Sequence, residues 1–201
     1  MVKKIAKDPN LAQQIAWIIS RLLDPVWEIP AAILFAVLFA VREGIRWRFL
    51  GLVLFIDAVV PFIFFATMLV HGQIKDWDIQ NRRDRIPLYL FTLFCHMGGL
   101  WLAHELGKTE LVYILLVFYV IAVVFFLITT RWKISLHAGV NTLLVVAINM
   151  FYDGRYALLF LLVPLVSWAR VVEKHHSWRQ VVVGASLAGG MTYLGLLIAG
   201  V

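Results

Sequence analysis

The chain has 201 residues, of which 62% are hydrophobic and 15% are charged. Soluble domains are typically about 45–50% apolar and about 25% charged, so the composition excludes an ordinary soluble globule, a disordered chain and a disulfide scaffold. The mean hydropathy of +0.87 favours a polytopic membrane protein. A net charge of +6 would suggest nucleic acid in a soluble protein. Here the cations lie between apolar spans, so we expect membrane lipids and phosphate-bearing lipids as partners, and no nucleic acid.

The N-terminal segment is predicted to be an amphipathic helix. Three lysines in the first seven residues precede the stretch from Leu11 to Leu23, whose apolar residues recur at helical spacing. The basic start resembles a signal peptide, but no small-residue cleavage site follows it, so we expect the segment to be retained. Residues 1–25 are therefore predicted to form an interfacial helix that ends at Asp24–Pro25, and residues 26–201 a single transmembrane domain.

Seven apolar stretches follow, which predict an all-α bundle of about six or seven transmembrane helices. Four of them are shorter than the roughly 20 residues that cross a bilayer, so we expect their helices to extend into the flanking polar residues. The stretches are Val26 to Val41, Phe49 to Val70, Pro87 to Ala103, Leu111 to Thr130, Leu136 to Met150, Ala157 to Val172 and Arg179 to Val201.

Seven spans divide the connecting segments between two faces of the membrane. Face A, as we name it, holds the N-terminus and residues 71–86, 131–136 and 173–178. The other face holds residues 42–48, 104–110 and 151–156 and the C-terminus. Face A carries 13 of the 18 lysines and arginines when those at the adjoining helix ends are included. The positive-inside rule therefore predicts that face A is cytoplasmic, in an inner or plasma membrane.

Three polar clusters lie on face A, at residues 75–87, 131–137 and 170–180. Two spans separate each cluster from the next, so the chain returns to the same face each time and the clusters can converge on one site. Arginines present a planar fork of donors to phosphate oxygens, and two histidines can divide the roles of nucleophile and general acid. The alternative is that these cations only anchor lipid headgroups at span ends.

The clusters resemble the signature of the type 2 phosphatidic acid phosphatase superfamily, the integral membrane lipid phosphate phosphatases. That signature has a lysine seven residues before an arginine–proline pair, then proline–serine–glycine–histidine, then serine–arginine with a histidine six residues after the arginine. In this chain Arg85 matches the first block, Ser135 and His137 match the second, and Arg170 and His176 match the third at the required separation. The resemblance covers residues 70–190.

The resemblance implies a phosphohistidine mechanism in which His176 attacks phosphorus and His137 protonates the leaving lipid oxygen. It implies no metal and no other cofactor. The substrate would be a prenyl phosphate or diphosphate, or a phosphoglycerolipid, that enters laterally between spans. The phosphate would be held by Arg85, Arg170 and Ser135. The groups expected to support them are Asp78, Arg82, Lys133 and Gln180.

Six positions depart from the superfamily pattern. Ile86 replaces the proline of the first block, Ile134 and Leu136 replace the proline and glycine of the second, and Ala169 replaces the serine of the third. The two departures that bear on activity are Asp78, which stands where the lysine is expected, and Gln180, which stands where an aspartate follows the histidine. Gln180 can still accept a hydrogen bond from an imidazole N–H, but as a neutral dipole it should help less. Asp78 could pair with Arg82 or Arg85, or supply the missing anion to a histidine. A divergent substrate, or an impaired protein that binds or transports lipid phosphate, remains open at this point.

A third class is a Mg²⁺-dependent intramembrane prenyltransferase, which rests on the acidic residues Asp76, Asp78 and Asp84 alone. The arginines interleaved among them favour ion pairing over a metal site. We therefore expect no metal.

Three further features need an explanation. Asp57 and His96 lie inside predicted spans, where an ionisable residue is a functional candidate by default, although the two could simply satisfy each other. His175 misses the six-residue spacing from Arg170 and is predicted to be an exposed loop residue. The last span is rich in glycine and has small residues four apart, which permits close helix contact either within the chain or in a homodimer.

Overall fold

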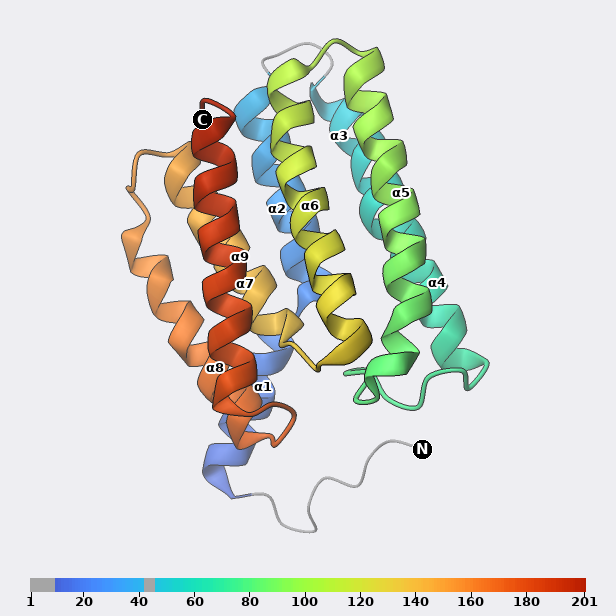
Figure 1. Ribbon diagram of the computed structural model, residues 1–201, viewed down its shortest axis with the longest axis vertical. Helices are drawn as coiled ribbons and strands as arrows, with labels where there is room; N and C mark the ends of the chain where they lie inside the picture. The colour runs from blue at the N-terminus through green and yellow to red at the C-terminus, as the bar shows by residue number, and fades with distance from the viewer. Residues whose placement is uncertain (1–9, 42–45) are drawn as a thin grey trace.

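The computed structural model describes residues 10–41 and 46–201 (Figure 1). These residues form helices joined by short connections, and no β-strand occurs among them. The prediction of an all-α helical bundle is confirmed. The elements are α1 (Leu11–Leu22), α2 (Pro25–Ala40), α3 (Arg46–Leu54), the π-helical turn η1 (Phe55–Val59), α4 (Val60–Val70), the 3-10 turn η2 (Arg82–Arg85), α5 (Ile86–Glu105), α6 (Thr109–Arg131), α7 (Leu136–Phe151), the 3-10 turn η3 (Ala157–Leu161), α8 (Leu162–Val172) and α9 (Trp178–Ile198).

In the described part of the chain, five helical segments are long and apolar enough to cross a membrane. This supports an integral, multi-pass membrane protein. The five segments are Leu11–Ala40, Trp47–Val70, Arg82–Glu105, Thr109–Arg131 and Trp178–Ile198.

The two remaining apolar helices are shorter than predicted. We expected them to extend into their polar flanks, and this is wrong for α7, which has 16 residues and a length of about 24 Å at 1.5 Å per residue. Ser135 caps the start of α7, and a turn with Asp153 and Gly154 in the left-handed region follows its end. α8 is likewise only 11 residues long after η3. The polar residues at these helix ends, Ser135 and Arg170, are buried inside the bundle.

The connections expected on face A lie together at one end of the bundle. Figure 1 shows the loops α4–α5, α6–α7 and α8–α9 at the lower end, beside α1, and the C-terminus at the upper end. The prediction that the three polar clusters share one face is therefore confirmed.

The centre of the bundle is α7, most of whose residues are buried. It packs against α2, α8 and α9. Glycines of α9 allow close approach, because a Cβ on Gly184 would lie 2.7 Å from the Ser135 carbonyl oxygen and one on Gly189 would lie 2.8 Å from Thr142 Cγ2. These small residues thus serve contacts within the chain, and a homodimer through the last span stays a prediction.

Helix α1 packs along α8 with its small residues and exposes its large apolar ones. Ala16 and Ser20 are buried. The exposed apolar residues recur at helical spacing, which is the surface that an interfacial helix requires. They are Leu11, Ile15, Ile18 and Leu22.

Replacing Gly184 by alanine should destabilise the bundle. The new Cβ would press on the Ser135 backbone oxygen, which cannot rotate away, so we expect a loss of about 1–3 kcal/mol in the free energy of unfolding. Gly190→Ala on the same helix is the matched control, because no atom lies within 4 Å of its Cβ and alanine favours helix by about 1 kcal/mol. Thermal unfolding of both variants in one detergent measures the difference, and equal melting temperatures would contradict the packing described here.

Candidate functional site

The three polar clusters of face A touch one another. Arg85 of the first cluster donates from Nη1 to the carbonyl oxygen of Ile134 in the second, at 3.4 Å. Arg170 of the third cluster places Nη2 2.9 Å from Oδ1 of Asp78 in the first. The three clusters therefore converge, as the two spans between each cluster and the next allow. Five of the predicted site residues lie within one polar region. They are Asp78, Arg85, His137, Arg170 and His176.

Asp78 is at the centre of this region. Its Oδ1 contacts Arg170, and its Oδ2 lies 2.6 Å from Nη2 of Arg21 in α1. The side chain is 8% exposed. Burial alone would raise the pKa of the Asp78 carboxyl, but Arg170, His175 and Arg21 together hold it well below its usual range. Asp78 is therefore an ionised carboxylate enclosed by cations.

The side-chain pairing of Asp78 with Arg82 or Arg85 that the sequence suggested is not found in the described structure. Arg82 donates to the backbone carbonyl of Thr130. Arg85 donates from Nε to the carbonyl of Ile79 at 2.8 Å and from Nη2 to the backbone carbonyl of Asp78 at 3.1 Å. The donors of both arginines reach backbone carbonyls, while the Asp78 carboxylate contacts cations of α8 and α1.

Arg170 holds a second carboxylate. Its Nη1 lies 3.2 Å from Oε2 of Glu173, and the same oxygen accepts a hydrogen bond from the hydroxyl of Ser20. Burial raises the pKa of Glu173, and Arg170 and Ser20 oppose this shift. Arg170 itself is 1% exposed. Ser20 and Arg21 thereby fix α1 to the site, a role that the sequence did not indicate for either residue.

Asp24 is a site residue that sequence reasoning missed. Its Oδ1 caps α2 by accepting from the Val26 N–H at 3.0 Å. Its Oδ2 accepts from Trp77 Nε1 at 2.9 Å and from Arg21 Nη1 at 3.2 Å. The same oxygen lies 3.6 Å from His137 Nε2. The sequence pattern predicts only that a helix ends at Asp24. Its position at the face-A end of the first span was the signal that could have indicated a role in the site.

His176 is held by the capping box of α9. Gln180 Oε1 accepts from the Ser177 N–H at 3.0 Å and lies 3.2 Å from His176 Nδ1. Because a carbonyl oxygen can only accept, Nδ1 carries the hydrogen and Nε2 keeps its lone pair. Burial, followed by the charges of Arg85 and Arg170, lowers the pKa of His176 to about 2, so the ring is neutral near pH 7.

Three other residues have contacts of a different kind. Ser135 is fully buried and its Oγ accepts from the Ala138 N–H at 3.4 Å, so its visible role is to cap α7. The prediction that His175 is exposed is wrong, because its imidazole is drawn inward to within 3.7 Å of the Asp78 carboxylate and is 10% exposed. Lys133 Nζ donates to the backbone carbonyl of His175 at 2.9 Å and so joins the second cluster to the third.

An apolar cavity of about 270 Å³ extends from this polar region into the bundle between α2, α4, α5, α6 and α7. Phe62 and Trp77 line it and are also 41% and 36% exposed. Its polar end is lined by Asp24, Asp78, Arg85, His137 and His176. Its apolar wall includes Ile29, Ile33, Phe65, Leu88, Phe118 and Phe125.

The acidic residues of the first cluster do not gather at one point. Asp76 accepts from the Gln80 N–H, Asp84 accepts from Asn81 Nδ2, and Asp78 is paired with arginines. Within residues 10–41 and 46–201, no three histidine, cysteine, aspartate or glutamate side chains are arranged to hold a metal ion.

Comparison with known proteins identifies no relative of this chain. No family model, no curated protein and no solved structure matches the chain. The resemblance to the type 2 phosphatidic acid phosphatase superfamily therefore stays a prediction that rests on the matched residues.

The ion pair between Arg170 and Asp78 should stabilise the fold cooperatively. Removing one partner of a buried pair leaves an uncompensated charge, so Arg170→Gln and Asp78→Asn should each cost about 3–5 kcal/mol in the free energy of unfolding. The double variant should cost at least about 1 kcal/mol less than the sum, because neither charge is then left alone.

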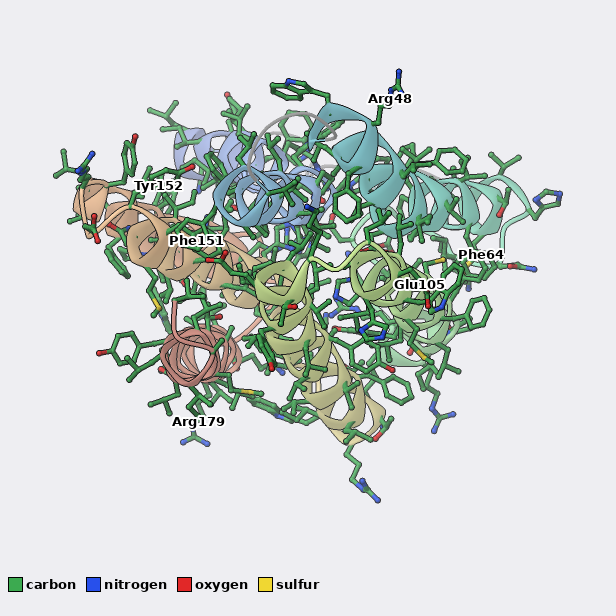
Figure 2. All side chains as sticks on the ribbon, turned by 90° about the horizontal axis from the view of Figure 1, so that it is seen from above. Arg48, Phe64, Glu105, Phe151, Tyr152 and Arg179 are labelled. Atoms are coloured by element: carbon green, nitrogen blue, oxygen red, sulfur yellow. The ribbon has the colours of Figure 1, made fainter. Side chains whose placement is uncertain are left out.

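The measurement is a double-mutant cycle by thermal or chemical unfolding in one detergent. Arg179→Gln is the control, because Arg179 is exposed and points away from the bundle (Figure 2), and it should change stability by less than about 0.5 kcal/mol. Strict additivity of the two single variants would show that the pair makes no joint contribution.

Proposed function

We propose that the protein is a membrane lipid phosphatase that hydrolyses a phosphate ester or diphosphate through a phosphohistidine intermediate. The substrate would be a prenyl phosphate or diphosphate, or a phosphoglycerolipid. One observation carries the proposal above the others: a buried, neutral histidine with one nitrogen fixed as a donor lines an apolar cavity beside a second histidine and an arginine.

His176 suits the role of nucleophile. A histidine attacks through an unprotonated ring nitrogen, and the Gln180 contact leaves that lone pair on Nε2. Burial and the surrounding cations keep the ring neutral, so no deprotonation has to precede attack. Gln180, in place of the expected aspartate, orients the ring and raises its basicity less than a carboxylate would.

His137 suits the role of general acid, with Asp24 as the anion beside it. Burial, followed by Arg170, lowers the pKa of the His137 imidazole, and the Asp24 carboxylate 3.6 Å away opposes this shift. His137 would therefore take up a proton when the phosphate binds, before it acts as the acid. In the first step Nε2 of His176 bonds to phosphorus and the phosphorus–oxygen bond to the lipid breaks. The lipid oxygen keeps the electron pair and takes the proton of His137.

The second step regenerates the enzyme. Water attacks the phosphohistidine, gives its proton to the neutral His137, and the nitrogen–phosphorus bond breaks to release phosphate. His137 thus returns to its protonated form and His176 to its neutral form, with no net consumption of protons by the protein.

Arg85 suits the binding of phosphate. Its contacts with three backbone carbonyls engage three of the five guanidinium donors and neutralise none of its charge. The remaining donors can meet phosphate oxygens and the charge that develops on them in the transition state. Arg170 would serve the same purpose only if the Asp78 carboxylate moves or is displaced.

The apolar cavity suits the lipid chain. Phe62 and Trp77 line the cavity and are partly exposed, and we expect a lipid to enter laterally from the bilayer beside them. The excess of Lys and Arg on face A supports a cytoplasmic position for the polar end of the cavity, in an inner or plasma membrane.

A second candidate is a lipid-phosphate binding or transport protein with impaired turnover. Asp78 favours it, because this carboxylate pairs with Arg170, a cation that the phosphatase would use for phosphate. A Mg²⁺-dependent prenyltransferase is the third class, and it has the least support because Asp76, Asp78 and Asp84 have separate partners.

Phosphate release from a panel of lipid phosphates and diphosphates, with and without EDTA, separates the three classes. We expect release that EDTA does not abolish, that falls at least about 10³-fold in His176→Ala, and that falls about 10²–10⁴-fold in His137→Ala. His71→Ala is the control, because His71 is exposed at the end of α4, and it should keep full activity.

Two results would contradict the phosphatase. Lipid phosphate binding without any release would establish the second class. Loss of activity in EDTA, together with transfer of the prenyl group to an acceptor, would establish the third.

A further inference from the structure

A second pair of buried polar side chains lines the same cavity, far from the phosphate-binding region. Oδ2 of Asp57 lies 2.8 Å from Nδ1 of His96, and Nε2 of His96 lies 3.0 Å from the carbonyl oxygen of Leu115. Asp57 is 3% exposed. Both residues line the cavity, and both belong to membrane-spanning segments.

The pair lies deep in the bundle. His96 of α5 lies eleven residues after Arg85, the residue that precedes this helix, which is about 16 Å along the helix axis and about half the thickness of the hydrocarbon core. The cavity lining is mostly apolar, with Ile33, Leu93 and Phe118 among its members, and it also includes the hydroxyl side chains of Tyr89 and Thr92. The cavity therefore has one charged end at the membrane surface and a pair of ionisable side chains near the bilayer centre.

The backbone around Asp57 has two special features. This residue lies in the π-helical turn η1, a feature that occurs frequently at functional sites. Gly99 of α5 faces it, and a Cβ at that position would lie 2.5 Å from Asp57 Oδ2 and 2.7 Å from Oδ1. Only a glycine lets α5 approach the carboxylate this closely.

The positions of the hydrogens on Asp57 and His96 show which kind of group this pair can bind. The Leu115 carbonyl only accepts, so Nε2 of His96 carries a hydrogen. A second hydrogen lies between Nδ1 of His96 and Oδ2 of Asp57. The pair has no net charge whichever of these two atoms carries that hydrogen. In both forms Oδ1 of Asp57 is an acceptor, and it is buried without a hydrogen-bond donor among the described residues. A buried acceptor without a donor lacks the hydrogen bonds that it would make in water, so a ligand that donates to it would be favoured.

We propose that Asp57 and His96 form a binding site for a hydroxyl group on the hydrocarbon chain of the ligand. A neutral donor fits, because a cation would enter an apolar cavity in which this pair carries no net charge. The ligand is thus an amphiphile whose hydroxyl lies roughly 16 Å from its polar headgroup, the length of helix between Arg85 and His96. The anionic nature of that head rests on the proposed function, whereas the hydroxyl site does not.

The test compares ω-hydroxydodecyl phosphate with ω-methoxydodecyl phosphate, whose ether oxygen cannot donate. Binding to the full chain in detergent is followed by tryptophan fluorescence, since Trp77 lines the cavity. We expect the hydroxyl compound to bind about tenfold more tightly, which is about 1.4 kcal/mol. The preference should vanish for the hexyl pair, whose chains are too short to reach Asp57.

Variants locate the preference. Asp57→Val should abolish it, Asp57→Asn should keep part of it because the amide retains an acceptor, and Thr92→Val is the control that removes another cavity hydroxyl without effect. Equal binding of the two dodecyl phosphates to the natural chain would overturn the proposal even if Asp57→Val does not fold. So would a preference that persists in a folded Asp57→Val protein.

A neutral pair of probes separates this site from the phosphatase proposal. Dodecanol should bind more tightly than dodecane to the natural chain, and equally to Asp57→Val. If this holds while neither phosphate binds, the hydroxyl site stands and the phosphate-binding proposal fails. If no probe of either kind binds, the hydroxyl site is overturned.

Discussion

The contact between Arg170 and Asp78 joins the end of α8 to the loop before η2, and Arg21 extends it to α1. Arg170 and Asp78 are almost fully buried, so each needs an opposite charge at contact distance to offset the loss of water. This pair therefore holds the first and third polar clusters together. Once they meet, the capping residues of α7 and α9 bring two histidines to the same cavity. The positions of His137 and His176 therefore depend on an ion pair that neither of them makes.

The two arginines of the polar region differ in their partners. The Asp78 carboxylate offsets the charge of Arg170, whereas Arg85 keeps its charge among neutral carbonyls. Asp78 stands where the superfamily pattern has a lysine, yet Arg85 and Arg170 remain as cations at this end of the cavity. By our proposals, the cavity beyond them would give a lipid apolar contact along its chain and one polar contact at Asp57.

Much of the architecture followed from the sequence, because hydropathy defines the long helices and span parity brings 75–87, 131–137 and 170–180 to one end. The partners of the charged side chains could not be predicted in the same way. Asp78 lies close to Arg82 and Arg85 in sequence, yet its carboxylate pairs with cations of α8 and α1, since the final partner depends on tertiary geometry. Asp24 is similarly hidden, because its capping of α2 explains it locally and its approach to His137 depends on how α2 packs against α7.

The most direct test of the account is to detect phosphorus on His176. The protein would be mixed with a lipid phosphate, quenched within one turnover under alkaline conditions that preserve phosphohistidine, and analysed by peptide mass spectrometry. The account predicts a phosphoryl group on His176 in the natural chain and none in His176→Ala. The phosphohistidine should accumulate in His137→Ala if this change slows its hydrolysis more than its formation. Phosphate release without any phosphorylated histidine, or with the label on His175, would contradict it.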